Sequence, residues 1–242
     1  MDSAGAPALH ENEPHQNDVA QRLNWLRAGV LGANDGIVSV AAIVVGVAGV
    51  TTQSGPILVA GTAGLVGGAI SMALGEYVSV SSQKDSQEAL IEKERLELQD
   101  QPEEELEELT AIYQGKGLSL DTARKVAREL TAHDALGAHL SAELNIDETD
   151  IVSPWNAALA SAVAFVTGAI LPMAAILLPP ENIRVPMTFA AVLVALAATG
   201  ALGAWIGGGS KLRAAARVVA GGALALAATY SIGNLLGASG VL

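Results

Sequence analysis

Residues 27–50, RAGVLGANDGIVSVAAIVVGVAGV, form an apolar stretch that contains a single carboxylate, Asp35. The stretch exceeds the roughly 20 apolar residues that a helix needs to cross a bilayer. A charged side chain within such a span costs about 2.5–3.5 kcal/mol on insertion scales, so it usually marks an ion pathway or a proton relay. The segment therefore predicts a membrane-spanning helix with a functional carboxylate inside it.

The composition of the whole chain supports this interpretation. Its 242 residues are 51% hydrophobic and 16% charged, whereas a soluble domain of this size carries about 25% charged residues. We predict an all-α membrane protein with five transmembrane helices, at residues 27–50, 56–80, 155–178, 186–208 and 214–237. The expected domains are a polar N-terminal tail at 1–26, two transmembrane helices at 27–80, a soluble domain at 81–152, and three transmembrane helices at 153–242.

Acidic residues concentrate in segment 81–152, which we call the acidic insert. It holds 18 of the 25 acids and seven bases, which accounts for nearly all of the net charge of −12. Because no basic face exists to neutralise phosphates, nucleic acid is not an expected partner. The chain has no cysteine, so a metal site would use oxygen, nitrogen or thioether ligands, which suit hard or borderline divalent ions.

Basic residues between the spans predict the orientation. Arg22 and Arg27 precede the first span, and Lys211, Arg213 and Arg217 lie between the last two. By the positive-inside rule the N-terminus and the acidic insert are then cytoplasmic. The C-terminus is expected outside.

A second carboxylate, Glu76, lies in the second span. Asp35 comes eight residues after Arg27, and Glu76 comes eight residues before Lys84. At 1.5 Å per residue, both carboxylates are expected about 12 Å from the cytoplasmic ends of their helices. They would therefore lie at a similar depth.

Further ligand atoms are expected beside these two carboxylates. Ser39 and Met72 lie one helical turn from Asp35 and Glu76 on the same faces, and Asn34 adjoins Asp35. The five residues offer carboxylate, amide, hydroxyl and thioether ligands to a passing cation. The alternative is structural, with Asp35 capping a helix break near Gly36 and Glu76 bonding to another span.

Small residues recur at a spacing of four, which allows close helix approach in lipid. This pattern is consistent either with packing inside one chain or with a homodimer seam. The pairs are Gly64 and Gly68, Gly203 and Gly207, and Gly233 and Gly237.

The acidic insert is predicted to contain three helices. The first continues from the second span to about Gln99, the second covers 102–114, and the third covers 120–145 with a break near His133 and Asp134. Acidic side chains and one imidazole pair at spacings of three and four along these helices, which places ligands side by side. The pairs are Glu94 with Glu97, Glu104 or Glu105 with Glu108, and His139 with Glu143. A bound cation or a solvated acidic surface would explain these pairs equally well.

Three motifs resemble the vacuolar iron transporter family: GANDGIVS at 32–39, SMALGEYVSV at 71–80 and SQKD at 82–85. The resemblance covers about residues 20–240. It implies a homodimer of five-helix subunits that exchanges Fe²⁺ or Mn²⁺ for protons, with a cytoplasmic metal-binding domain. Asp35 and Met72 match the transport pathway of the family, and Glu76 lies in the same motif.

The resemblance also implies metal ligands in the acidic insert, namely Glu94, Glu97, Glu105, Glu108 and Glu143. One departure is His139, near which plant members carry methionine. Imidazole is a good ligand for borderline metal ions, so a metal site with His139 in it is still expected.

The predicted function is export of Fe²⁺ or Mn²⁺ from the cytoplasm, with protons as the counter-ion and no prosthetic group. The expected partners are divalent metal ions, protons, membrane lipid and a second copy of the chain. Bacterial members of the family would lie in the cell (inner) membrane. A membrane-anchored metal sensor or buffer is the alternative, although an anchor would need neither Asp35 nor Glu76. An enzyme is not expected, because no nucleophile–base pair is visible.

Overall fold

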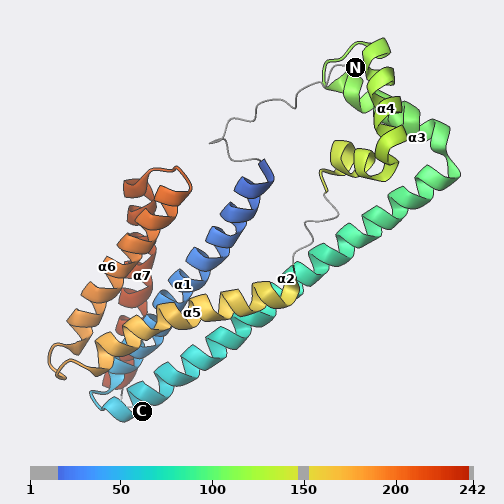
Figure 1. Cartoon of the computed structure of the whole chain (residues 1–242). Helices are drawn as coiled ribbons and strands as arrows, with labels where there is room; N and C mark the ends of the chain where they lie inside the picture. The colour runs from blue at the N-terminus through green and yellow to red at the C-terminus, as the bar shows by residue number, and fades with distance from the viewer. Residues whose placement is uncertain (1–15, 147–152, 240–242) are drawn as a thin grey trace, which may run out of the picture. The chain divides into compact units, whose positions relative to one another are not determined.

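The structure, a computed structural model, describes residues 16–146 and 153–239 (Figure 1). Every element among these residues is helical and none is a strand, which confirms the all-α prediction. The helices are α1 (Gln16–Val50), α2 (Ser54–Asp100), α3 (Pro102–Gly115), α4 (Leu120–His139), the π-helix η1 (Leu140–Leu144), α5 (Pro154–Leu177), α6 (Arg184–Ile206) and α7 (Lys211–Ala238).

Five of these helices are long and apolar enough to cross a membrane: Gly29–Val50 of α1, α2, α5, α6 and α7. They coincide with the five predicted spans. The helix α1 starts before the predicted span, at Gln16. The 47 residues of α2 contain both the second span and the first helix of the acidic insert, as predicted.

The chain divides into two compact units, which we describe separately. The membrane unit contains the residues up to Leu74 and those from Ala158 onward, and the insert unit contains Gly75–Ala157. The helix α2 begins in the first unit and ends in the second.

The core of the membrane unit lies where α1 packs against α5, α6 and α7. Figure 1 shows α6 and α7 side by side, and both contact α1. Val40, Phe165, Val192 and Leu226 are at most 1% exposed in this core. Their side chains come from all four helices. Because lipid is as apolar as these side chains, van der Waals packing holds the helices together, rather than removal of apolar surface from water.

Glycines permit the closest helix contacts. A Cβ on Gly233 of α7 would clash with the carbonyl oxygen of Gly46 on α1, and one on Gly68 of α2 would clash with the ring of Phe165. A Cβ on Gly64 would likewise strike Ile43. These three glycines therefore pack within the chain, and a homodimer seam along any of the pairs stays a prediction.

A buried arginine joins the loops at one end of the membrane unit. Arg184, at the start of α6, is 5% exposed. Its Nη1 donates hydrogen bonds to the carbonyl oxygen of Thr52 at 3.1 Å and to Ser54 Oγ at 3.2 Å. Because hydrogen bonds from a charged group are stronger than neutral ones, Arg184 fixes the α1–α2 turn to the start of α6.

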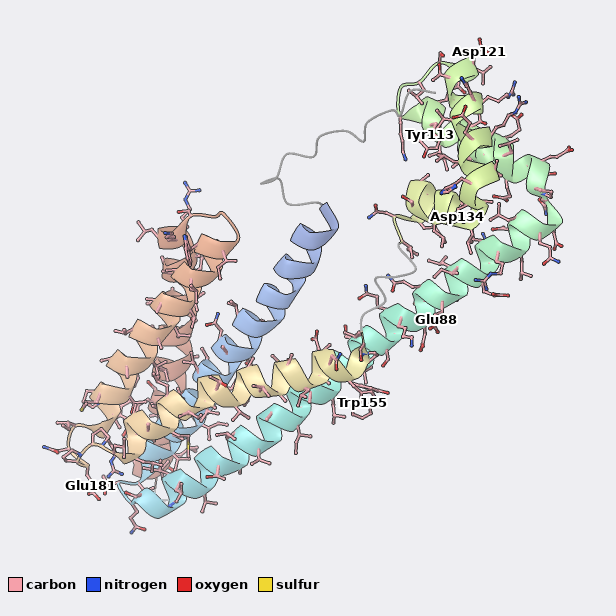
Figure 2. All side chains as sticks on the ribbon, viewed as in Figure 1. Glu88, Tyr113, Asp121, Asp134, Trp155 and Glu181 are labelled. Carbon is pink, nitrogen blue, oxygen red and sulfur yellow. The ribbon has the colours of Figure 1, made fainter. Side chains whose placement is uncertain are left out.

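In the insert unit, α3 and α4 pack together through Leu109, Ala123 and Ala127, all of which are fully buried. The helix α4 starts at the predicted cap, where Ser119 Oγ accepts a hydrogen bond from Thr122 N at 3.4 Å. It breaks at Asp134, labelled in Figure 2, where φ is −159° and ψ is 94°. The break was predicted from the sequence. The π-helical turn of η1 was not.

Candidate metal centre

The carboxylate of Asp35 lies on the exposed surface of the membrane unit. The helix α1 continues through Gly36 without a break, so Asp35 does not cap one. Its Oδ1 accepts a hydrogen bond from Ser39 Oγ at 2.8 Å, one turn along the helix. The spacing of the two residues predicted that they share a helix face, but the hydrogen bond between them was not predicted.

The rotation of α1 explains why Asp35 is exposed. A Cβ on Gly36 would clash with the carbonyl oxygen of Phe165, and one on Gly168 would clash with that of Ala33. These approaches press one face of α1 against α5. On another face, Asn34 Oδ1 accepts a hydrogen bond from Thr199 Oγ1 of α6 at 2.5 Å. Asn34 therefore turns toward α6, and one lone pair of its amide oxygen is occupied.

The other two predicted pathway residues lie on α2. Met72 is half-buried and packs against the core of the membrane unit. Glu76 is half-buried in the insert unit. It precedes Tyr77, whose ring contacts Trp155 with centroids 4.8 Å apart, and Figure 2 labels Trp155 at the start of α5. The meeting of Asp35, Met72 and Glu76 in one pathway stays a prediction.

Three predicted ligands of the acidic insert meet at one point. Glu94 of α2, Glu105 of α3 and His139 of α4 each offer one ligand atom within 4.8 Å of the others. From His139 Nδ1, the distance is 2.9 Å to Glu94 Oε1 and 3.5 Å to Glu105 Oε2. The three side chains come from three helices and are buried. We call them the trio.

Several polar atoms of the trio have no hydrogen-bond partner among the described residues. These are both ring nitrogens of His139, which is fully buried, and Oε1 of Glu94, which is 4% exposed. The contact between Glu94 Oε1 and His139 Nδ1 is short but is not aligned as a hydrogen bond. Burying polar atoms without partners is costly. A cation between the lone pairs would remove that cost.

Three more carboxylates surround the trio, namely those of Glu97, Glu108 and Glu143. Glu143 Oε2 lies 3.9 Å from His139 Nδ1. The negative charges of all three act on Glu94 and on Glu105. All six insert residues that were predicted as ligands thus belong to one electrostatic cluster.

Burial and repulsion shift the titration of these groups. Burial is the main reason that the pKa of Glu94 rises to about 7, and the neighbouring carboxylates raise it further. Burial also raises the pKa of Glu105 and of Glu143. The pKa of His139 is lowered by burial, against an opposing effect of Glu108. The cluster therefore favours bound protons or a bound cation over bare carboxylates.

The local fold explains how His139 and Glu143 reach the cluster. Asp134 Oδ1 accepts a hydrogen bond from Gly137 N at 3.0 Å, so Asp134 caps a new helical segment just before His139. The π turn of η1 follows, and it ends at Asn145 in the left-handed conformation with φ of 51°. Lys116 Nζ donates a hydrogen bond to the carbonyl oxygen of Ala142 at 3.3 Å.

Sequence reasoning missed the supporting roles of Lys116, Asp134 and Lys93. Lys93 Nζ lies 3.0 Å from Glu97 Oε2. The spacing of four between Lys93 and Glu97 was the available signal. Lys116 acts on η1 through the carbonyl oxygen of Ala142, and Asp134 acts within α4 through Gly137 N. The contact of Lys116 joins residues far apart in the sequence, so helical spacing did not predict it.

Comparisons with known proteins identify the family of this chain. The model of the VIT family matches residues 26–234. A vacuolar iron transporter of Acanthamoeba castellanii is 44% identical over 230 residues, which are 95% of this chain and 84% of the relative. The vacuolar iron transporter homolog 2 of Arabidopsis thaliana is 35% identical over 100% of both chains. The vacuolar iron transporter homolog 5 of Oryza sativa subsp. japonica is 36% identical over 93% of this chain and 86% of its own length. From these matches and its five apolar helices, the chain belongs to the VIT family.

Proposed function

We propose that this protein is a metal-ion transporter, without enzymatic activity, that exports Fe²⁺ or Mn²⁺ from the cytoplasm in exchange for protons. The observation that carries the proposal is the trio, in which buried oxygen and nitrogen atoms converge without hydrogen-bond partners. The names of the relatives, which are vacuolar iron transporters and homologues of them, support the same class of cargo.

The insert unit captures the ion. Carboxylate oxygens suit Mn²⁺ and imidazole suits Fe²⁺, and Glu97, Glu108 and Glu143 complete the ligand set. Because metal ligands must be deprotonated, an arriving ion displaces the proton that Glu94 holds near neutral pH. Metal capture and proton release are therefore linked at this site.

The membrane unit passes the ion across the bilayer along Asp35, Met72 and Glu76, assisted by Asn34 and Ser39. Asp35 is exposed on a single chain although it lies in an apolar span. A carboxylate that faces lipid is costly, so a second copy of the chain covers it. The proposal is accordingly a homodimer with Asp35 on a pathway between the two copies.

The charge pattern orients the transporter, with the N-terminus and residues 81–152 in the cytoplasm and the C-terminus outside. The bases Lys211, Arg213 and Arg217 at the start of α7 are exposed and mark the cytoplasmic side. The cell membrane is the proposed location. Cysteine labelling of intact cells at a residue introduced beside Asp121 or beside Glu181 would test the orientation, since only the latter should react.

The decisive experiment is metal flux into proteoliposomes with an imposed pH gradient. Fe²⁺, Mn²⁺, Co²⁺ and Zn²⁺ are compared, and liposomes without protein provide the background. We expect flux of Fe²⁺ or Mn²⁺ that rises with the gradient and collapses when an ionophore dissipates it. Binding of these ions without flux of any of them would instead identify a membrane-anchored sensor or buffer.

A further inference from the structure

Lys93 is a cation placed within the acidic cluster of the insert unit. It directly precedes Glu94 on α2. Its Nζ lies 3.0 Å from Oε2 of Glu97, one helical turn further on. The side chain of Lys93 is 67% exposed and that of Glu97 is 37% exposed, whereas the trio is buried. The ion pair therefore lies at the solvent side of the cluster.

The positive charge of Lys93 reaches beyond Glu97. Lys93 interacts favourably with Glu94 and Glu143 as well as with Glu97. It also opposes the repulsion that the other carboxylates exert on Glu105 and Glu143. In the metal-free protein, Lys93 thus supplies part of the positive charge that a divalent ion would bring.

The carboxylate of Glu97 cannot pair fully with the ammonium group of Lys93 and with a metal ion at the same time. Its Oε2 is held by an ammonium group at salt-bridge distance, so a metal ion must compete for that carboxylate. Exposed ion pairs of this kind contribute little to stability, which means that a divalent ion can displace the ammonium. The remaining positive charge on Lys93 still repels the bound ion.

We propose that Lys93 is an affinity-determining residue of the insert site: it occupies Glu97 when metal is absent, yields it when metal binds, and keeps the bound ion releasable. This inference rests on the proposed function, because it assumes that the acidic cluster takes up a divalent ion. For a transporter, weaker capture is useful, since an ion held too tightly would not move on to the membrane unit.

The test measures Mn²⁺ binding by calorimetry on the full chain in detergent, comparing Lys93→Gln with Lys125→Gln. Lys125 is a matched control, because it also forms an exposed pair with a glutamate four residues on, Glu129 at 3.9 Å. Both variants remove one positive charge. We expect Lys93→Gln to bind Mn²⁺ about three- to tenfold more tightly, given the size of a charge interaction at a few ångströms in water. Lys125→Gln should stay within about twofold of the parent protein, because Lys125 is not among the charges that act on Glu94, Glu105 or Glu143.

A double-mutant cycle isolates competition for Glu97 from a general charge effect. In a Glu97→Gln background, Lys93→Gln should give a clearly smaller gain in affinity than in the parent protein. Equal affinities of Lys93→Gln and Lys125→Gln, or an equal gain with and without Glu97, would overturn this inference alone. A parent protein that binds no Mn²⁺ would overturn the proposed metal site and the inference with it.

Discussion

The carboxylates of Asp35 in the membrane unit and Glu94 in the insert unit differ in exposure and in hydrogen bonding. In the membrane unit, Asp35 is exposed on the single chain and its Oδ1 is hydrogen-bonded by Ser39. In the insert unit, Glu94 is 4% exposed and its Oε1 has no hydrogen-bond partner among the described residues. The trio is thus assembled within one chain. The carboxylate of Asp35, by contrast, is accessible from outside the chain.

This difference separates the two kinds of carboxylate for which we propose a function. Glu94 is buried with its pKa raised to about 7, so it can hold either a proton or part of the charge of a metal ion. Asp35 is kept in place by a neighbour on its own helix, and it is accessible from outside the chain. We therefore expect loss of Asp35 to affect transport and loss of the insert carboxylates to affect capture.

The largest effect is expected for Asp35→Asn, which should abolish metal flux in proteoliposomes while the protein stays folded. The amide keeps the volume and can still accept the hydrogen bond from Ser39, but it loses the charge that stabilises a cation in the membrane. Metal binding by the insert unit should be unchanged in calorimetry. Asp121→Asn, on the exposed face of α4, is the matched control. Parental flux in a folded Asp35→Asn protein would remove this residue from the pathway.

The next largest effect is expected when Glu94, Glu97, Glu105 and Glu108 are all replaced by Gln. Because loss of a single supporting residue around a metal already costs 10–100-fold, metal affinity should fall by at least about 100-fold. The metal-free protein should unfold at a higher temperature, since repulsion among the carboxylates is relieved. The control replaces Glu88, Glu92, Glu103 and Glu104, which lie outside the trio. A lower melting temperature for the first variant would show that its glutamates make stabilising salt bridges.

A change of pH should have a smaller effect. It should shift the stability of the metal-free protein and the affinity of the protein for metal in opposite directions. The pKa of Glu94 is raised to about 7, above its ordinary value of 4.5. Its contribution to metal-free stability is therefore present at low pH and is lost as pH rises toward 7. His139, whose pKa is lowered, opposes this by losing stability as pH falls below 6.5.

Metal affinity should change in the reverse direction, because protons compete for the same oxygens. Thermal melts at pH 7.5 and pH 5.5 should show that the stabilisation by added Mn²⁺ shrinks on acidification, while Glu94→Gln should weaken this dependence. An Mn²⁺ stabilisation that does not change over this range would argue against Glu94 as a ligand.

The smallest effect is expected for Asp134→Ala, which removes the hydrogen bond to Gly137 N. Loss of a helix cap costs about 1 kcal/mol, and the segment that carries His139 and Glu143 would be less well held. We expect a slightly lower melting temperature and a few-fold loss of Mn²⁺ affinity. Asp134→Asn keeps a cap acceptor and should stay close to the parent protein. If both variants bind Mn²⁺ like the parent protein, the capped break does not position the ligands.

The sequence by itself determined the helices and most of their limits. Apolar length predicted the five spans, the proline at Pro102 and the cap at Ser119 placed the insert helices, and the break at Asp134 was also predicted. These signals are local, because they depend on neighbouring residues and on the length of an apolar run. The six insert ligands were singled out by spacing and by family resemblance. Their assignment as ligands stays a prediction.

Only the tertiary structure decided which carboxylates are buried together. Glu94 and Glu97 lie three residues apart on α2, yet Glu94 joins the trio while Glu97 faces solvent and Lys93. Glu105 rather than Glu104 turns inward on α3. Helical spacing alone leaves such choices open, because the rotation of each helix is set by the side chains it packs against. The exposure of Asp35 has the same origin, since Gly36 and Gly168 let α1 and α5 approach closely and so fix which face of α1 is covered.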